Sequence, residues 1–165
     1  MPSLNWSPDF ALDVPQMDAT HQEFVALLAD VEAAPDAALV ARWQALVEHT
    51  QGHFDNEDRW MLATRFAAGN CHTTHHRMVL EVLRQGLTMG QAGDLAPIRQ
   101  MARELASWFP QHADSMDAAL AMHLQRVGFD PATGRMAHPD ALPDEVIHGC
   151  GGASCSPAAE LAAEA

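Results

Sequence analysis

Apolar residues recur at helical rather than strand spacing along the first 127 residues, and proline and glycine gather in the short gaps between. This spacing predicts four helices, at about Gln16–Ala34, Asp36–Ala63, Cys71–Met89 and Leu95–Val127. Connections this short favour antiparallel neighbours. We therefore expect an all-α fold, an up-down-up-down antiparallel four-helix bundle followed by a flexible C-terminal tail.

The chain changes in character at Gly128, after which it is rich in Gly, Pro and Ala and has no sustained apolar period. We expect residues 1–127 to form the bundle domain and residues 128–165 to form a mobile tail. The spacing of Cys150 and Cys155 in this tail permits a disulfide or a metal site, although a plain linker is the favoured interpretation.

Each predicted helix carries an inward stripe at heptad spacing, and polar residues interrupt these stripes. The inward series are Met17, His21, Phe24, Leu28, Val31; Leu39, Trp43, Leu46, Thr50, His53, Glu57, Trp60; His72, His76, Leu80, Leu83, Leu87; and Met101, Leu105, Trp108, His112. His49 and His75 lie one position off a stripe and should flank the core. The three remaining histidines have no expected metal role: His123, His138 and His148.

The polar positions of the four stripes lie at one level of the bundle. The number of residues between each polar position and the loop that joins its helix to the next can be converted to a height, at roughly 1.5 Å per residue. These heights differ by about one helical turn or less. Imidazoles and carboxylates in a dry core are costly if unpaired, and a bound cation compensates for that cost. The sequence therefore predicts a metal site with these inward ligands: His21, His53, Glu57, His72, His76 and His112.

The ligand types suit iron, with zinc, copper and manganese also open. Five imidazoles are too many for one catalytic zinc, and two metals that share a carboxylate fit better. A second acid follows His112, but spacing does not choose between Asp114 and Asp117, because Asp117 lies about 140° from His112 on an ideal helix. Pro110 should bend or bulge this helix, which could redirect either acid.

The composition of the chain argues against several classes of partner and of chemistry. The formal net charge of −13 argues against nucleic acid and anionic membranes. No segment reaches membrane-spanning length, and three cysteines are too few for a disulfide framework, so we expect a cytoplasmic protein with no membrane insertion. The chain has no tyrosine, which excludes tyrosine-based chemistry, but it has ten histidines.

The segments HFDNE (from His53), HTTHH (from His72) and WFPQHADSMD (from Trp108), together with His21, resemble the hemerythrin family over about residues 4 to 127, in particular the single-domain bacteriohemerythrins. The resemblance implies a non-haem centre of two iron ions with an oxo or hydroxo bridge. By that resemblance one iron is coordinatively full and is held by His72, His76 and His112. The other iron is held by His21 and His53 and keeps an open position. Glu57 and Asp117 bridge the two irons. The resemblance thus selects Asp117 over Asp114.

The function implied by the resemblance is reversible dioxygen binding without enzymatic turnover, for oxygen storage, delivery or sensing, with an oxygen-accepting protein as a further partner. The alternatives are a di-iron oxidase, peroxidase or nitric-oxide-handling enzyme, and a plain or iron-storage bundle. An apolar wall should protect the centre from water. Its candidates are Phe24, Trp60, Met61, Trp108 and Phe109, and the family usually has an aliphatic residue where Phe109 stands.

Overall fold

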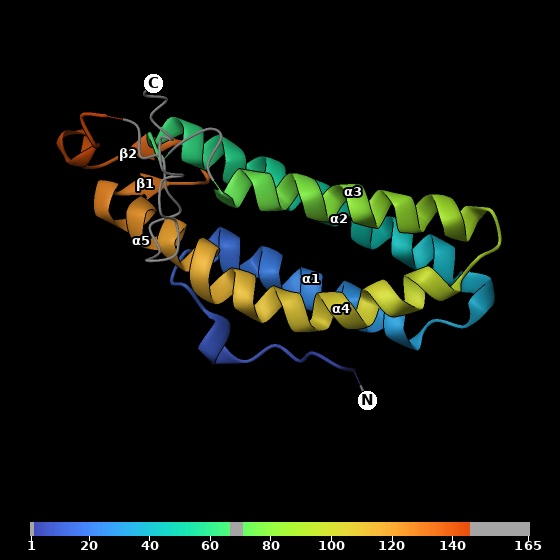
Figure 1. The fold of residues 1–165 in the computed structure, drawn as a ribbon. Coiled ribbons are helices and arrows are strands. Elements are labelled where there is room, and N and C mark those ends of the chain that lie inside the picture. The colour runs from blue at the N-terminus through green and yellow to red at the C-terminus, as the bar shows by residue number, and fades with distance from the viewer. Residues whose placement is uncertain (1, 67–70, 146–165) are drawn as a thin grey trace, which may run out of the picture.

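The computed structural model describes residues 2–66 and 71–145 and contains four long helical segments. They are α1 (Pro15–Ala33), α2 (Asp36–Ala63), α3 (Cys71–Gln91), and a fourth made of α4 (Ala96–His112), the π-helical turn η2 (Ala113–Asp117) and α5 (Ala118–Val127). Successive helices contact one another, and α4 also contacts α1, which closes the bundle (Figure 1). The predicted four-helix fold is confirmed.

Short elements flank the bundle at the end where α5 lies. The 3-10 turn η1 (Pro8–Phe10) precedes α1, and the strands β1 (Phe129–Asp130) and β2 (Arg135–Met136) form an antiparallel pair followed by η3 (Pro139–Ala141). Gly128 ends α5 with a positive φ of 61°, a conformation that glycine adopts without strain. Residues 146–165, which include His148, Cys150 and Cys155, lie outside the described part of the chain.

Two apolar clusters pack the bundle on either side of a polar layer. One cluster includes Leu28, Trp43 and Ile98, and the other includes Trp60 and Leu120. Full burial of each large apolar side chain stabilises the fold by roughly 1.5–3 kcal/mol. The inward stripes predicted from the sequence are buried, apart from Leu87, Met101 and Trp108, which are half-buried. Within residues 2–66 and 71–145, no helix is long and apolar enough to cross a membrane.

Candidate metal centre

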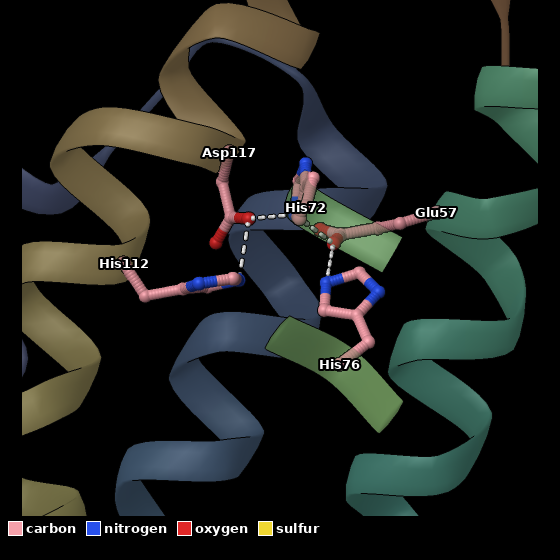
Figure 2. Close-up of side chains that lie close together, drawn as sticks. All are labelled: Glu57, His72, His76, His112 and Asp117. Atoms are coloured by element: carbon pink, nitrogen blue, oxygen red, sulfur yellow. Dashed lines mark ion pairs between the residues drawn. The ribbon is translucent and has the colours of Figure 1, made fainter. Parts of the chain in front are cut away.

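All seven residues predicted as ligands are buried and meet in the polar layer between the two clusters. They form two groups, in each of which one ligand atom per residue lies within 4.8 Å of the others. The first group has five members: Glu57, His72, His76, His112 and Asp117. The second has four: His21, His53, Glu57 and Asp117. Figure 2 shows the five-membered group, in which side chains from three helical segments point toward one another.

Helical periodicity places the first five of these side chains. His53 and Glu57 are four residues apart on α2, and His72 and His76 are four residues apart on α3, so each pair shares one face of its helix. His21 projects inward from α1 at the same level. Three helices thus bring five ligand-type groups to one layer through regular α-helical geometry alone.

The π-helical turn supplies the seventh group. In η2 the backbone N–H of Ala118 bonds to the carbonyl oxygen of Ala113, five residues earlier, where an α-helix would use the residue four earlier. This wider turn brings Asp117, five residues after His112, onto the side that His112 faces, and their Oδ1 and Nε2 atoms are 3.1 Å apart. Asp114 is exposed. The fourth helix therefore departs from α geometry shortly after Pro110, as predicted, and it is Asp117 that enters the layer.

The Asp117 carboxylate turns one oxygen toward each ligand group. Its Oδ1 lies 3.0 Å from Nε2 of His72 and 3.1 Å from Nε2 of His112, both in the five-membered group. Its Oδ2 lies 3.2 Å from Nε2 of His21 in the four-membered group. A carboxylate oriented in this way can bridge two cations.

Glu57 is oriented in the same manner from the opposite side. Its Oε2 lies 3.4 Å from Nε2 of His72 and 3.3 Å from Nε2 of His76. Its Oε1 lies 3.0 Å from Nε2 of His53 and 4.0 Å from Nε2 of His21. The two groups therefore share two carboxylates, and all five imidazoles direct Nε2 at them.

Several of these buried polar atoms form no hydrogen bond within the described residues, although they lie 3.0–3.4 Å from one another. They are Nε2 of His21, His72, His76 and His112, Oε2 of Glu57 and both carboxylate oxygens of Asp117. Buried polar groups are nearly always satisfied, so a concentration of unsatisfied ligand atoms at one point indicates that something else binds there. The donor set of imidazole nitrogens and carboxylate oxygens fits a transition-metal ion such as iron.

The charges of the layer favour cation binding. Burial and the neighbouring Asp117 would raise the pKa of Glu57, but the histidines around it outweigh both and hold that pKa well below its usual range. Burial likewise opposes ionisation of Asp117, and contacts with His112, His21 and His72 lower its pKa well below the usual value. In the metal-free chain the two carboxylates raise the pKa of His72 to about 10, although burial alone would lower it. A metal ion would displace such protons and neutralise the same carboxylates.

Two residues outside the ligand groups, Asp58 and Phe54, contact the His76 ring, and neither was predicted from the sequence. Oδ1 of Asp58 lies 2.9 Å from Nδ1 of His76, the ring nitrogen that faces away from the layer. The ring of Phe54 stacks on the His76 imidazole, with centroids 3.9 Å apart and planes 5° apart. Asp58 and Phe54 are sequence neighbours of Glu57 and His53, which were predicted as ligands, and this is the signal that could have identified them.

The predicted wall residues divide between the two sides of the layer. Phe109 meets the His21 imidazole edge-on at 5.2 Å and stacks on Phe24 at 4.8 Å. Trp108 stacks on the His112 imidazole at 4.4 Å. Trp60 and Met61 are buried in the apolar cluster on the α5 side of the layer.

The other described histidines belong to neither ligand group. Nε2 of His49 lies 3.1 Å from the carbonyl oxygen of Thr20, and His75 and His138 are exposed. His123 is buried, but its Nε2 lies 2.8 Å from the Thr64 carbonyl oxygen.

Comparison with known proteins agrees with this geometry. The family model described as "Hemerythrin HHE cation binding domain" matches residues 12–124. A protein named bacteriohemerythrin from Ralstonia nicotianae is 36% identical over 130 residues, which cover 79% of this chain and 95% of that protein. No solved structure shows a significant match. The chain, with its buried layer of histidines and two shared carboxylates, belongs to the hemerythrin family of cation-binding helical bundles.

Proposed function

We propose that the chain binds two iron ions in the buried layer and uses them to bind dioxygen reversibly, for oxygen storage, delivery or sensing. The observation that carries the proposal is the pair of unequal ligand groups that share Glu57 and Asp117. Membership in the hemerythrin family and the similarity to a protein named bacteriohemerythrin support the choice of metal and ligand.

The inequality of the two groups gives the site its function. One group offers three imidazoles with the two carboxylates, whereas the other offers two imidazoles, His21 and His53, with the same carboxylates. The second metal therefore keeps more room for an exogenous ligand. When bound, the two irons supply that open position and the electrons that dioxygen takes up and later returns.

The protein side chains hold and protect this arrangement. Asp58 fixes the proton of His76 on Nδ1, which leaves the Nε2 lone pair directed at the layer. Phe109 and Phe24 pack against the His21 side, where the room for a ligand lies. Their apolar rings keep bulk water away from the centre, which favours release of unchanged dioxygen over side reactions.

Oxygen uptake by the reduced protein tests the proposal. The iron-loaded chain is reduced without air, titrated with dioxygen in a closed cell, and then returned to low oxygen pressure. We expect uptake to stop at one dioxygen per two irons and the gas to be recovered, because the site binds without turnover. Continuous consumption of dioxygen in the presence of excess reductant would instead identify an oxidase or peroxidase.

Two neighbouring histidines provide a matched test of the ligand assignment. His76→Ala should lower the iron content and the melting temperature together, since metal binding stabilises the folded chain. His75→Ala, at an exposed position one residue away, should change neither. Equal iron content in both variants would contradict the proposed ligand set.

A further inference from the structure

Several surface hollows approach the metal layer, and two of them do so from different sides. One lies between α3 and α4, has a volume of about 270 Å³, and is lined by Val82, Glu104 and Trp108 among others. The other lies between the N-terminal segment and the fourth helix and has a volume of about 380 Å³. We call this second hollow the N-terminal groove, and its lining includes Asp9, Phe10, Leu12, Pro110, Ala113 and Asp114.

Each hollow is connected to a different ligand group. From the α3–α4 hollow, Trp108 leads to His112, which belongs to the group with three imidazoles. From the N-terminal groove, the Phe10 ring meets Phe109 edge-on at 6.3 Å, and Phe109 meets His21 at 5.2 Å. His21 belongs to the group with two imidazoles. Of these two hollows, the N-terminal groove is the one that approaches the metal with room for a ligand.

We propose that small ligands reach the centre through the N-terminal groove and that the ring pair Phe10–Phe109 is the gate they pass. The inference rests on the proposed function, because it concerns access to the metal held by His21 and His53. It assigns a role to the N-terminal segment, which contributes no ligand, and it makes Phe10 a determinant of the rate at which ligands enter and leave.

The two rings of the gate are packed to different degrees. Phe109 is 1% exposed and stacked on Phe24, so its ring is fixed from behind. Phe10 is only half-buried, and it ends the three-residue turn η1, outside the four long helices. Its other ring contact, with Trp6 at 5.9 Å, also lies in the N-terminal segment. Movement of Phe10 would uncover Phe109 without disturbing a helix, so Phe10 is the moving part of the gate.

The charge at the mouth of the groove favours neutral ligands. Asp9 and Asp114 line it and are exposed, and the described residues that line this groove include no arginine. Their carboxylates repel an approaching anion but leave an uncharged diatomic gas unaffected. The gate therefore combines a nonpolar passage with an anionic mouth, which suits dioxygen and slows small anions.

Azide binding to the oxidised, iron-loaded protein tests the gate. In stopped-flow measurements Phe10→Ala should raise both the association and the dissociation rate by about tenfold or more, with the equilibrium constant nearly unchanged, because a gate alters access and not the bound state. Val82→Ala, which enlarges the α3–α4 hollow, is the matched control and should leave both rates unchanged. Equal rates in Phe10→Ala and the unaltered chain, or acceleration by Val82→Ala, would overturn the assignment.

A charge variant tests the same route without removing a ring. Asp9→Asn combined with Asp114→Asn should speed azide association by roughly two- to fivefold at low ionic strength, and the gain should vanish at about 1 M salt. Dioxygen association with the reduced protein should not change. Glu104→Gln, in the other hollow, is the control. An unchanged azide rate would refute this route.

The outcomes also separate failure of the gate from failure of the proposed function. Iron content and reversible oxygen uptake are measured on every variant. If both are intact while the azide rates are the same in the Phe10, Asp9 and Asp114 variants as in the unaltered chain, the gate is wrong and the oxygen-binding function stands. If the unaltered chain takes up no oxygen, the proposed function fails independently of the gate.

Discussion

The imidazole of His76 is held from two directions at once. Its Nδ1 lies 2.9 Å from the Asp58 carboxylate, and its ring face lies against Phe54. A ligand imidazole that is fixed by a carboxylate has its tautomer set and its metal-binding nitrogen made more basic. The Asp58 side chain is 42% exposed, so this contact connects the buried layer with the surface between α2 and α3.

Removal of this carboxylate should weaken metal binding. We expect Asp58→Ala to reduce the affinity for iron by roughly 10- to 100-fold, because the His76 ring loses its fixed acceptor. Asp58→Asn should retain part of the affinity, since its amide oxygen can still accept. Competition with a chelator measures the effect. Asp55→Ala, at an exposed position in the same surface hollow, is the control, and an equal loss there would refute the positioning role.

In the fourth helix, the position of one predicted ligand could not be derived from helical spacing. The stripes on α1, α2 and α3 predicted His21, His53, Glu57, His72 and His76, because ligands one α-helical turn apart share a face. Asp117 could not be derived in this way, since an α-helix places it far from His112. The choice depends on the i to i+5 bonding of Ala113–Asp117, and Pro110 signalled only that the helix would be irregular.

The π-helical turn makes a testable distinction between two acids three residues apart. Asp117→Asn should lower the iron bound per chain, because a buried bridging carboxylate is lost. Asp114→Asn should leave iron binding unchanged, since Asp114 is exposed. Elemental analysis of purified variants, with the melting temperature measured with and without iron, gives the answer. Normal iron content in Asp117→Asn would show that the turn does not position a ligand.

His123 joins α5 to the end of α2. Its Nε2–H donates to the carbonyl oxygen of Thr64 at 2.8 Å, and Arg126 donates to its Nδ1 at 3.1 Å. Burial lowers the pKa of His123, and the charge of Arg126 lowers it further, while the bond to Thr64 opposes both. The imidazole is therefore mainly neutral in the folded chain at pH 7.

This lowered pKa predicts how stability depends on pH. The unfolded chain, with an ordinary histidine pKa near 6.5, binds the proton more readily than the folded one. The contribution of His123 to the free energy of unfolding is thus fully present above about pH 6.5, and it is lost as the pH falls toward the lower pKa of the folded state. His123→Gln should flatten this dependence. Denaturant unfolding of both metal-free proteins at about pH 7.5 and 5.5 measures the difference, and parallel pH profiles would contradict the assignment.

In the molecule as a whole, the polar layer lies between two apolar clusters. The described residues of one come mainly from α1, α2, α3 and α4, and the helical residues of the other come from α1, α2 and α5. This arrangement was predictable, because residue counts between turns place the polar stripe positions at one level. The opposed orientation of the carboxylate oxygens and the contact of Phe10 with Phe109 were not predictable. They depend on rotamers and on the path of the chain before Pro15, and neither follows from helical periodicity.

An optical spectrum can show whether the chain holds a two-iron site that binds dioxygen reversibly. The protein is loaded with iron, reduced without air, exposed to oxygen and purged, with iron per chain measured on the same sample. We expect two irons per chain and a visible band that appears with oxygen and disappears on purging. Fewer than one iron per chain, or oxidation at once without a persistent band, would contradict this expectation.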